Sequence, residues 1–278
     1  MNFPFNRPLN IAHRGARSLA PENTLFSAQK GYDLGADLWE LDTGMTSDGE
    51  LVVIHDDTLS RTSNARSIFP QRSPWEVHTF SLGELRTLDF GSWFIDTDPF
   101  LQISAGNISE TEILSFKNAK IPTLEEALHF TLDNNWRVNV EIKDLSGKPG
   151  HLVVVEKVMK MVEGLGMLDR VMISSFNHSY IRRARAVSPS IVTAALVEEV
   201  VNDPIRLLKE TGASAFNPGT EVLPDTNLIA GLRRDGFDVF VWTVNEAARM
   251  RQLIEAGVSG IFTDYPQVLK EILKEFGD

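Results

Sequence analysis

Short runs of apolar and β-branched residues alternate along the chain with longer stretches whose apolar positions recur every three or four residues. The short runs are typical of strands, and the spacing i, i+3, i+4 is typical of amphipathic helices. The predicted strands are Leu9–His13, Leu38–Asp42 with its continuation Leu51–His55, Arg137–Lys143, Val171–Phe176, Ile191–Leu196, Ser214–Asn217, Val239–Val244 and Gly260–Thr263. The predicted helices are Asn23–Leu34, Thr123–Leu132, Leu152–Val162, Tyr180–Val187, Pro204–Glu210, Thr226–Arg234, Asn245–Ala256 and Pro266–Phe276.

Capping signals support these helices. Thr123 stands three residues before Glu126, which is the spacing of a capping box. Glycines follow several of the predicted helices, as left-handed closing residues do; they are Gly35, Gly166, Gly212, Gly236 and Gly257. Eight strand-plus-helix units in roughly 250 residues predict a closed (β/α)₈ TIM barrel, with residues 1–278 forming a single domain. A doubly wound open sheet is the alternative, because one sequence does not give the order of the strands.

The stretch 57–120 breaks this alternation, because it lies between the second strand unit and the next clear helix. It is too long for an ordinary connection and is rich in aromatic residues, including Trp75 and Trp93. We therefore expect an insertion subdomain after the second strand unit, packed near one mouth of the barrel. A plain surface insertion is the alternative interpretation.

Composition narrows the possible partners. Lys and Arg number 27 against 38 Asp and Glu, which gives a net charge of −11 and disfavours nucleic acid and anionic membranes. An anionic substrate would then need a metal ion or well-placed cations. The absence of cysteine excludes disulfides, thiolate catalysis and thiolate zinc sites. No apolar run approaches the ~20 residues of a membrane span, and the first fifteen residues do not resemble a secretory signal. We expect a cytoplasmic protein without a stable membrane anchor.

Charged residues gather at the ends of the first three predicted strand units. They are His13 and Arg14 after the first, Glu40 and Asp42 in the second, His55 after its continuation, and Glu141 and Lys143 at the end of the third. Residues two apart on a strand point to the same face, so Glu40 and Asp42 share one. In a barrel all these positions fall at the carboxyl-end mouth, where active sites lie.

Each of these residues alone has an ordinary structural interpretation. A carboxylate pair is often a solvated rim, and a lone histidine is more often structural than catalytic. Three carboxylates at one mouth, however, repel each other strongly unless a cation lies among them. Oxygen ligands without cysteine favour Mg²⁺ or Ca²⁺ over zinc. The remaining histidines lie in the insertion or on helices and receive no catalytic role; they are His78, His129, His151 and His178.

Several segments together resemble the glycerophosphodiester phosphodiesterases. They are HRGARSLAPENT, WELDTGMTSDGELVVIHDDTLSRT, IPTLEEAL, VEIK, WTVN and TDYP, which follow in the family's order from residue 9 to about residue 270. The resemblance implies a TIM barrel with an insertion after the second strand unit. It also implies that His13 and His55 are the acid/base pair, that Glu40, Asp42 and Glu141 hold one divalent metal ion, that Arg14 and Lys143 meet the phosphate, and that Trp242 lies in the substrate pocket. Glu22 matches a family position near the site, without a defined role.

The function implied by this resemblance is hydrolysis of small glycerophosphodiesters to glycerol 3-phosphate and an alcohol. Three points stay open: which histidine is the acid, whether water or a substrate hydroxyl attacks, and the oligomeric state. One alternative is a lysophospholipase D or sphingomyelinase D type of enzyme, with the aromatic insertion as a lipid entry. Another is a catalytically inactive barrel used for binding, which the intact set of histidines and acids argues against.

Trp242 also has a competing interpretation as core filler. Alternation along Val239–Val244 places it on the same face as Phe240 and Val244. Because the position is at a strand's carboxyl end, we expect the ring to line the substrate pocket.

Overall fold

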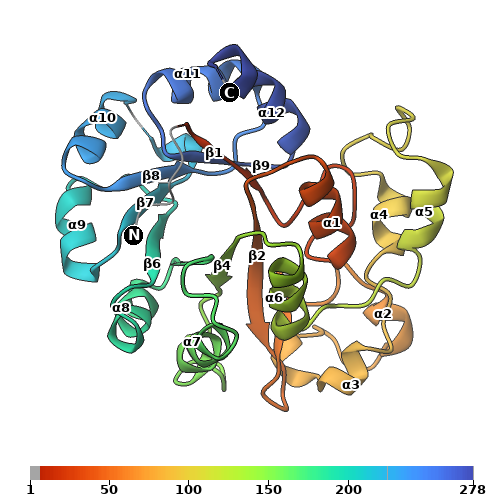
Figure 1. Cartoon of the computed structure of the whole chain (residues 1–278). Helices are drawn as coiled ribbons and strands as arrows, with labels where there is room; N and C mark the ends of the chain where they lie inside the picture. Colours follow the sequence, from red (N-terminus) through yellow and green to blue (C-terminus); the bar gives the residue numbers. More distant parts are fainter. Residues whose placement is uncertain (1–6, 224, 278) are drawn as a thin grey trace.

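A computed structural model of the chain describes residues 7–223 and 225–277. The first six residues, which belong to the segment that does not resemble a secretory signal, lie outside the described residues. Eight parallel strands form the centre of the molecule, with helices outside them (Figure 1). The strands are β1 Leu9–Ala12, β2 Leu38–Met45, β4 Val138–Ile142, β5 Val171–Ser175, β6 Val192–Val197, β7 Ala215–Pro218, β8 Asp238–Val241 and β9 Gly260–Thr263. Each corresponds to a predicted strand.

The sheet closes on itself. β1 pairs with β9, where Ile11 lies opposite Phe262, and also with β2, where Ile11 lies opposite Leu38. The remaining neighbours follow the order β9-β8-β7-β6-β5-β4-β2 and are all parallel. An open sheet has two edge strands, each with a parallel neighbour on one side only. Here every one of the eight parallel strands pairs with a parallel neighbour on both sides. The (β/α)₈ TIM barrel prediction is confirmed, and the open-sheet alternative is excluded.

The second strand unit differs from its prediction. β3 (Leu51–Val53) does not continue β2 but runs antiparallel to its last residues, with Val53 opposite Thr43. The amide of Ile54 then donates to the carbonyl of Asp42 at 2.9 Å. Because β3 turns back toward the barrel, it brings His55 to the level of Asp42. The predicted place of His55 at the mouth is correct, but the predicted reason, a barrel strand ending there, is wrong.

The predicted helices are all present on the outside of the barrel. They are α1 Leu25–Asp33, α6 Leu124–Asp133, α7 Val154–Gly164, α8 His178–Val187, α9 Pro204–Thr211, α10 Asn227–Arg234, α11 Ala247–Glu255 and α12 Pro266–Glu275, with a short 3₁₀ turn η2 at Thr220–Val222. The Thr123 capping box forms as expected, since Thr123 Oγ1 accepts from the Glu126 amide at 3.1 Å. No helix of the described ranges is long and apolar enough to cross a membrane.

The barrel interior is apolar in its lower part and charged near the mouth formed by the carboxyl ends of the strands. Its apolar layer consists of Leu9, Ile11, Leu38, Met172, Val192, Ala194, Ala215, Phe240 and Phe262, with Trp242 packed against it. Glu40 and Asp42 follow Leu38 at two-residue steps on the same strand and thus continue the inward face toward the mouth. The same alternation that places Leu38 in the apolar core therefore also places Glu40 and Asp42 at the mouth of the barrel.

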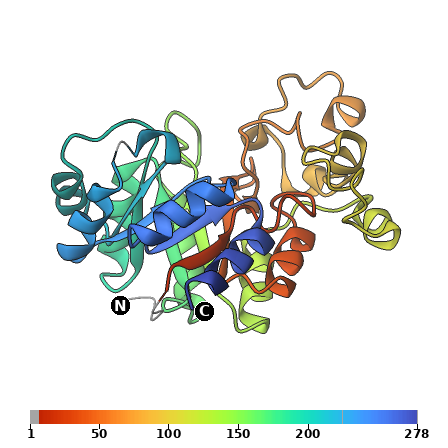
Figure 2. The same ribbon diagram turned by 90° about the horizontal axis from the view of Figure 1, so that it is seen from above.

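The stretch 57–120 forms a helical lobe at one side of the barrel (Figure 2). Its elements are α2 Ala65–Ile68, η1 Val77–Thr79, α3 Leu82–Leu85, α4 Ser92–Thr97 and α5 Glu110–Phe116. One apolar cluster joins Phe80 and Leu85 to Val52 of β3. A second joins Phe94 and Phe116 to Leu19, in the loop between β1 and α1. The lobe thus packs on the two segments that carry His13 and His55.

Candidate active site

The carboxyl ends of the strands surround a cavity of about 640 Å³. Seven of the eight predicted site residues line it, namely His13, Arg14, Glu40, His55, Glu141, Lys143 and Trp242. Asp42, the eighth, is almost fully buried. Its carboxylate lies 3.4 Å from Lys143 Nζ. The barrel therefore brings all the predicted site residues into one place, although they span 230 positions of sequence.

Three carboxylates form the centre of this site. Ligand oxygens of Glu40, Asp42 and Glu141 lie within 4.8 Å of one another, and all three residues are buried. Burial and the charges of Asp42 and Glu141 raise the pKa of Glu40 well above its usual range. Burial and Asp42 likewise raise the pKa of Glu141. This crowding of negative charge, together with a donor set of oxygens alone, fits a hard divalent cation.

The pKa of Asp42 shifts in the opposite direction. Burial alone would raise its pKa, but the Lys143 ammonium and the Arg14 guanidinium hold it well below the usual range. Asn23 Nδ2 adds a hydrogen bond to Asp42 Oδ2 at 2.8 Å. Lys143 Nζ also lies 2.7 Å from Glu141 Oε1. Arg14 and Lys143 thus contact the acids from two sides while both line the cavity.

A tight turn after β1 presents Arg14. Arg14 has a φ of 53°, and its amide donates to Glu40 Oε2 at 2.8 Å. Gly15 follows with a φ of 79°, and a Cβ there would lie 2.5 Å from the backbone of Ser27. Only glycine fits this left-handed position beside α1. The HRG segment therefore has a structural reason for its glycine.

Each cavity histidine is paired with an aspartate. His13 Nδ1 lies 2.7 Å from Asp264 Oδ1, and His55 Nδ1 lies 2.7 Å from Asp56 Oδ1. A carboxylate at Nδ1 favours the tautomer with a proton there and leaves Nε2 available. Burial and the Arg14 charge lower the pKa of His13, against the effect of Asp264. In both imidazoles Nδ1 faces an aspartate, so Nε2 is the ring nitrogen that a proton transfer would use.

Sequence reasoning missed the partners of these histidines. Asp264 directly follows Gly260–Thr263, so the strand-end rule that found His13 also points to it. Asp56 directly follows His55 in sequence, but adjacency alone does not show that the two side chains pair. Arg17 and Arg61, which contact these two aspartates, carry no strand-end signal. Only the folded arrangement identifies them.

Trp242 lines the cavity from a different position than expected. β8 ends at Val241, so Trp242 lies just beyond the strand, where its Nε1 donates to the carbonyl of Asn217 at 2.8 Å. Its ring packs edge-to-face on Phe176, with centroids 5.5 Å apart. Trp242 shares the interior cluster with Phe240, whereas Val244 belongs to the outer cluster. The predicted common face with Val244 is wrong, because the last parallel bridge of this strand is at Trp242 and the alternation does not continue beyond it.

Comparisons with known proteins agree with this geometry. The model of the Glycerophosphoryl diester phosphodiesterase family matches residues 13–268. The chain is 33% identical over 272 residues to a glycerophosphodiester phosphodiesterase of Caldanaerobacter subterraneus subsp. tengcongensis, covering 98% of this chain and 100% of the relative. A glycerophosphodiester phosphodiesterase of Bacillus altitudinis is 31% identical over 268 residues, with 95% and 98% covered.

Solved structures show the same relationship. A phosphodiesterase of Oleispira antarctica, in complex with the product sn-glycerol-3-phosphate, matches with a TM-score of 0.76 and 25% identity over 95% of this chain and 96% of that chain. A structure from Silicibacter pomeroyi matches in fold with a TM-score of 0.82 at 24% identity, covering 98% and 95%. The family match spans nearly the whole chain and every candidate site residue. The chain belongs to the glycerophosphoryl diester phosphodiesterase family and is an enzyme of that phosphoric diester hydrolase class.

Proposed function

We propose that the protein hydrolyses small glycerophosphodiesters to glycerol 3-phosphate and an alcohol, with one divalent metal ion and histidine acid/base catalysis. The observation that carries the proposal is the convergence, in one cavity, of two aspartate-paired histidines with three buried carboxylates and two cations. The product bound by the Oleispira antarctica phosphodiesterase supports the choice of substrate class.

The charged end of the cavity would hold the phosphate. Glu40, Asp42 and Glu141 would ligate one Mg²⁺ or Ca²⁺, which as a Lewis acid would stabilise negative charge on the phosphoryl oxygens. Arg14 and Lys143 line the same part of the cavity and would donate to those oxygens, where charge increases during attack. The overall negative charge of the protein is thereby overcome locally.

His13 and His55 would move the protons. Displacement at phosphorus needs one group to accept a proton from the attacking hydroxyl and another to donate one to the leaving alkoxide. Asp264 and Asp56 orient the two imidazoles so that Nε2 performs these transfers. The attacking group is either water or a hydroxyl of the substrate, and the second case passes through a cyclic phosphate.

Lipid substrates are a second candidate, favoured by one observation. The insertion exposes large apolar side chains, with Leu101 69% and Leu114 62% exposed. A lysophospholipase D type of enzyme needs such a surface to receive an acyl chain. Its headgroup chemistry would be the same, so the products distinguish the two candidates.

The decisive experiment compares products. Purified protein is incubated with glycerophosphocholine, lysophosphatidylcholine or bis(p-nitrophenyl) phosphate, with Mg²⁺, with Ca²⁺ or with excess EDTA. We expect glycerol 3-phosphate from glycerophosphocholine, dependent on metal. Lysophosphatidic acid as the dominant product would favour the lipid candidate. An absence of turnover with every substrate and metal would indicate a binding protein and overturn the proposal.

A further inference from the structure

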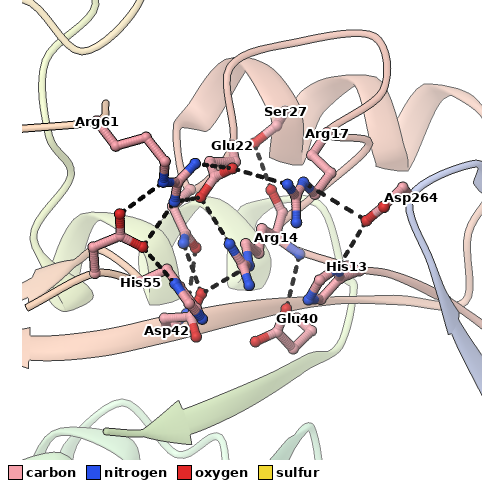
Figure 3. Close-up of polar contacts among 12 residues, drawn as sticks. His13, Arg14, Arg17, Glu22, Ser27, Glu40, Asp42, His55, Arg61 and Asp264 are labelled. Atoms are coloured by element: carbon pink, nitrogen blue, oxygen red, sulfur yellow. Dashed lines mark hydrogen bonds and ion pairs between the residues drawn. The ribbon is translucent and has the colours of Figure 1, made fainter. Parts of the chain in front are cut away.

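Glu22 lies in the loop between β1 and α1 and is surrounded by three arginines (Figure 3). Its carboxylate accepts from Arg14 at 2.9 Å and from two nitrogens of Arg61 at 2.7 and 3.0 Å. Arg17 lies 3.3 Å away on the same carboxylate. Burial alone would raise the pKa of Glu22, but the hydrogen bond from Arg61 and the charges of Arg14 and Arg17 lower it to about 2. One buried carboxylate thus neutralises part of three positive charges.

Three series of side-chain contacts, here called arms, lead from Glu22 to other parts of the site. The first arm leads to His55. Arg61 donates from Nε to Asp56 Oδ2 at 2.7 Å and from Nη2 to Asp56 Oδ1 at 2.9 Å. Asp56 Oδ1 in turn holds His55 Nδ1 at 2.7 Å. The planar guanidinium therefore bridges Glu22 and Asp56 with two bonds to each, a geometry that only arginine provides.

The second arm runs to His13, and the third runs to the acids. Arg17 Nε lies 3.7 Å from Asp264 Oδ1, which contacts His13. Arg14 Nε lies 3.4 Å from Asp42 Oδ2. All three arms start at Glu22, and each ends on a different part of the proposed machinery (Figure 3).

The insertion completes two of these arms. Arg61 belongs to the stretch 57–120, and its guanidinium lies 5.8 Å from the ring centre of Trp93. The Arg17 guanidinium lies 5.2 Å from the ring centre of Phe100. Aromatic faces at such distances attract guanidinium groups and limit their motion. The lobe therefore helps to fix both arginines between itself and the barrel.

We propose that Glu22 is the common positioning residue of the site, holding both histidine–aspartate pairs and Arg14 in place through Arg61, Arg17 and Arg14. The inference rests on the proposed function, in which His13 and His55 transfer protons. Glu22 does not line the main cavity as the described residues define it, so it acts through its partners. Without its charge, three guanidinium groups would repel one another and shift toward the aspartates, which would turn both imidazoles away from reactive geometry.

The main test is Glu22→Gln, which keeps the size of the side chain and removes its charge. Misplacement of catalytic groups by about 1 Å costs on the order of 10²-fold in rate. We expect a loss of that order in kcat on both glycerophosphocholine and bis(p-nitrophenyl) phosphate, with little change in KM and with Mg²⁺ affinity retained in calorimetry. Glu156→Gln is the matched control, since Glu156 pairs with Arg183 on the surface away from the site and should leave kcat unchanged.

The arms are tested separately with Arg17→Lys and Arg61→Lys, which keep the charge but lose the planar fork. These variants also test the proposal if Glu22→Gln does not fold. p-Nitrophenolate leaves without a proton. On bis(p-nitrophenyl) phosphate, kcat should therefore recover in the variant whose arm positions the histidine that acts as the acid, and it should stay low in the other variant.

Three results would overturn the inference. The first is a wild-type kcat in Glu22→Gln or in both lysine variants. The second is a loss of Mg²⁺ affinity in Glu22→Gln as large as its loss of kcat, which would mean that Glu22 acts through the metal site and not through the histidines. The third is an identical response of the two lysine variants to the leaving group. An inactive wild type would instead contradict the proposed function itself.

Discussion

The two halves of the cavity wall are built in different ways. The half at the ends of β1, β2 and β4 is crowded with ionisable groups, which depend on each other and on the insertion for their positions. The half at the ends of β5, β6 and β8, here called the aromatic half in contrast to the first, charged half, presents Phe176, Leu196 and Trp242, with the exposed Glu198 at its rim. That second half is held by apolar packing of Trp242 on Phe176, by the hydrogen bond from Trp242 to the carbonyl of Asn217, and by a hydrogen bond between His178 Nε2 and the carbonyl of Leu196.

This difference has energetic consequences. A group removed from the charged half leaves buried partners unpaired, which is costly, and in the proposed function it also removes charge that would act at the reacting phosphorus. Removal of the Trp242 ring from the aromatic half takes away apolar packing and one hydrogen bond, and in the proposed function it removes contact area with the substrate but no charge. Perturbations should therefore be severe in the charged half and modest in the aromatic half.

The largest effect is expected from the metal ligands. Glu40→Gln should lower the affinity for Mg²⁺ or Ca²⁺ and reduce kcat/KM by ~10³-fold or more, because charge stabilisation at the phosphoryl oxygens is lost. Calorimetric metal titration and product assays measure both, and circular dichroism should show the fold retained. Glu125→Gln, on the exposed side of α6, is the control. Full activity of the wild type in excess EDTA would contradict this prediction.

Acid should weaken the charged half next. Folding lowers the pKa of Glu22 from 4.5 to about 2, which corresponds to roughly 3 kcal/mol of stability. Because the pKa is lowered in the folded state, this contribution is present above pH 4.5 and is lost as the pH falls toward 2. Urea unfolding between pH 6 and 2.5 measures it. Glu22→Gln should lose less stability over that range, and parallel curves for the two proteins would show that Glu22 is not responsible.

The next largest effect is expected from the two histidines. His13→Ala and His55→Ala should each lose at least ~10²-fold in kcat, the usual scale of acid/base catalysis, with the fold retained in circular dichroism. On bis(p-nitrophenyl) phosphate the variant that lacks the acid should be rescued, and the variant that lacks the base should not. His129→Ala, on the exposed side of α6, should behave like the wild type. Equal defects on both substrates would mean that the histidines do not divide the roles.

The sequence predicts much of the charged half because its residues obey local rules. Alternation puts Glu40 and Asp42 on one face, and the carboxyl ends of parallel strands meet at one mouth. Those rules contain no information on which distant groups make contact. His13 pairs with Asp264 across 251 positions, and Arg61 reaches Glu22 from the insertion. The strand-end rule places Asp264 at the mouth, but only tertiary packing shows that it pairs with His13 and that Arg61 contacts Glu22.

Two errors have the same origin in strand pairing. The apolar run Leu51–Val53 looks the same whether it extends β2 or folds back on it, since hydrophobic alternation does not encode direction. Alternation also assumes that a strand continues, and β8 stops before Trp242. The cavity-lining position of Trp242 was predicted correctly, and only the common face with Val244 was wrong.

The smallest effect is expected in that aromatic half. The Trp242 ring lies against Phe176 and lines the cavity, where a flat apolar surface suits the carbon face of a glycerol unit. Trp242→Ala should raise KM for glycerophosphocholine by about tenfold, or about 1.4 kcal/mol of binding, with kcat less affected. Trp242→Phe keeps a flat ring and should recover most of the loss. Bis(p-nitrophenyl) phosphate has no glycerol, so its KM should change less. Equal losses on both substrates, or unfolding of Trp242→Ala, would instead identify Trp242 as a core residue and would remove the functional distinction between the two halves.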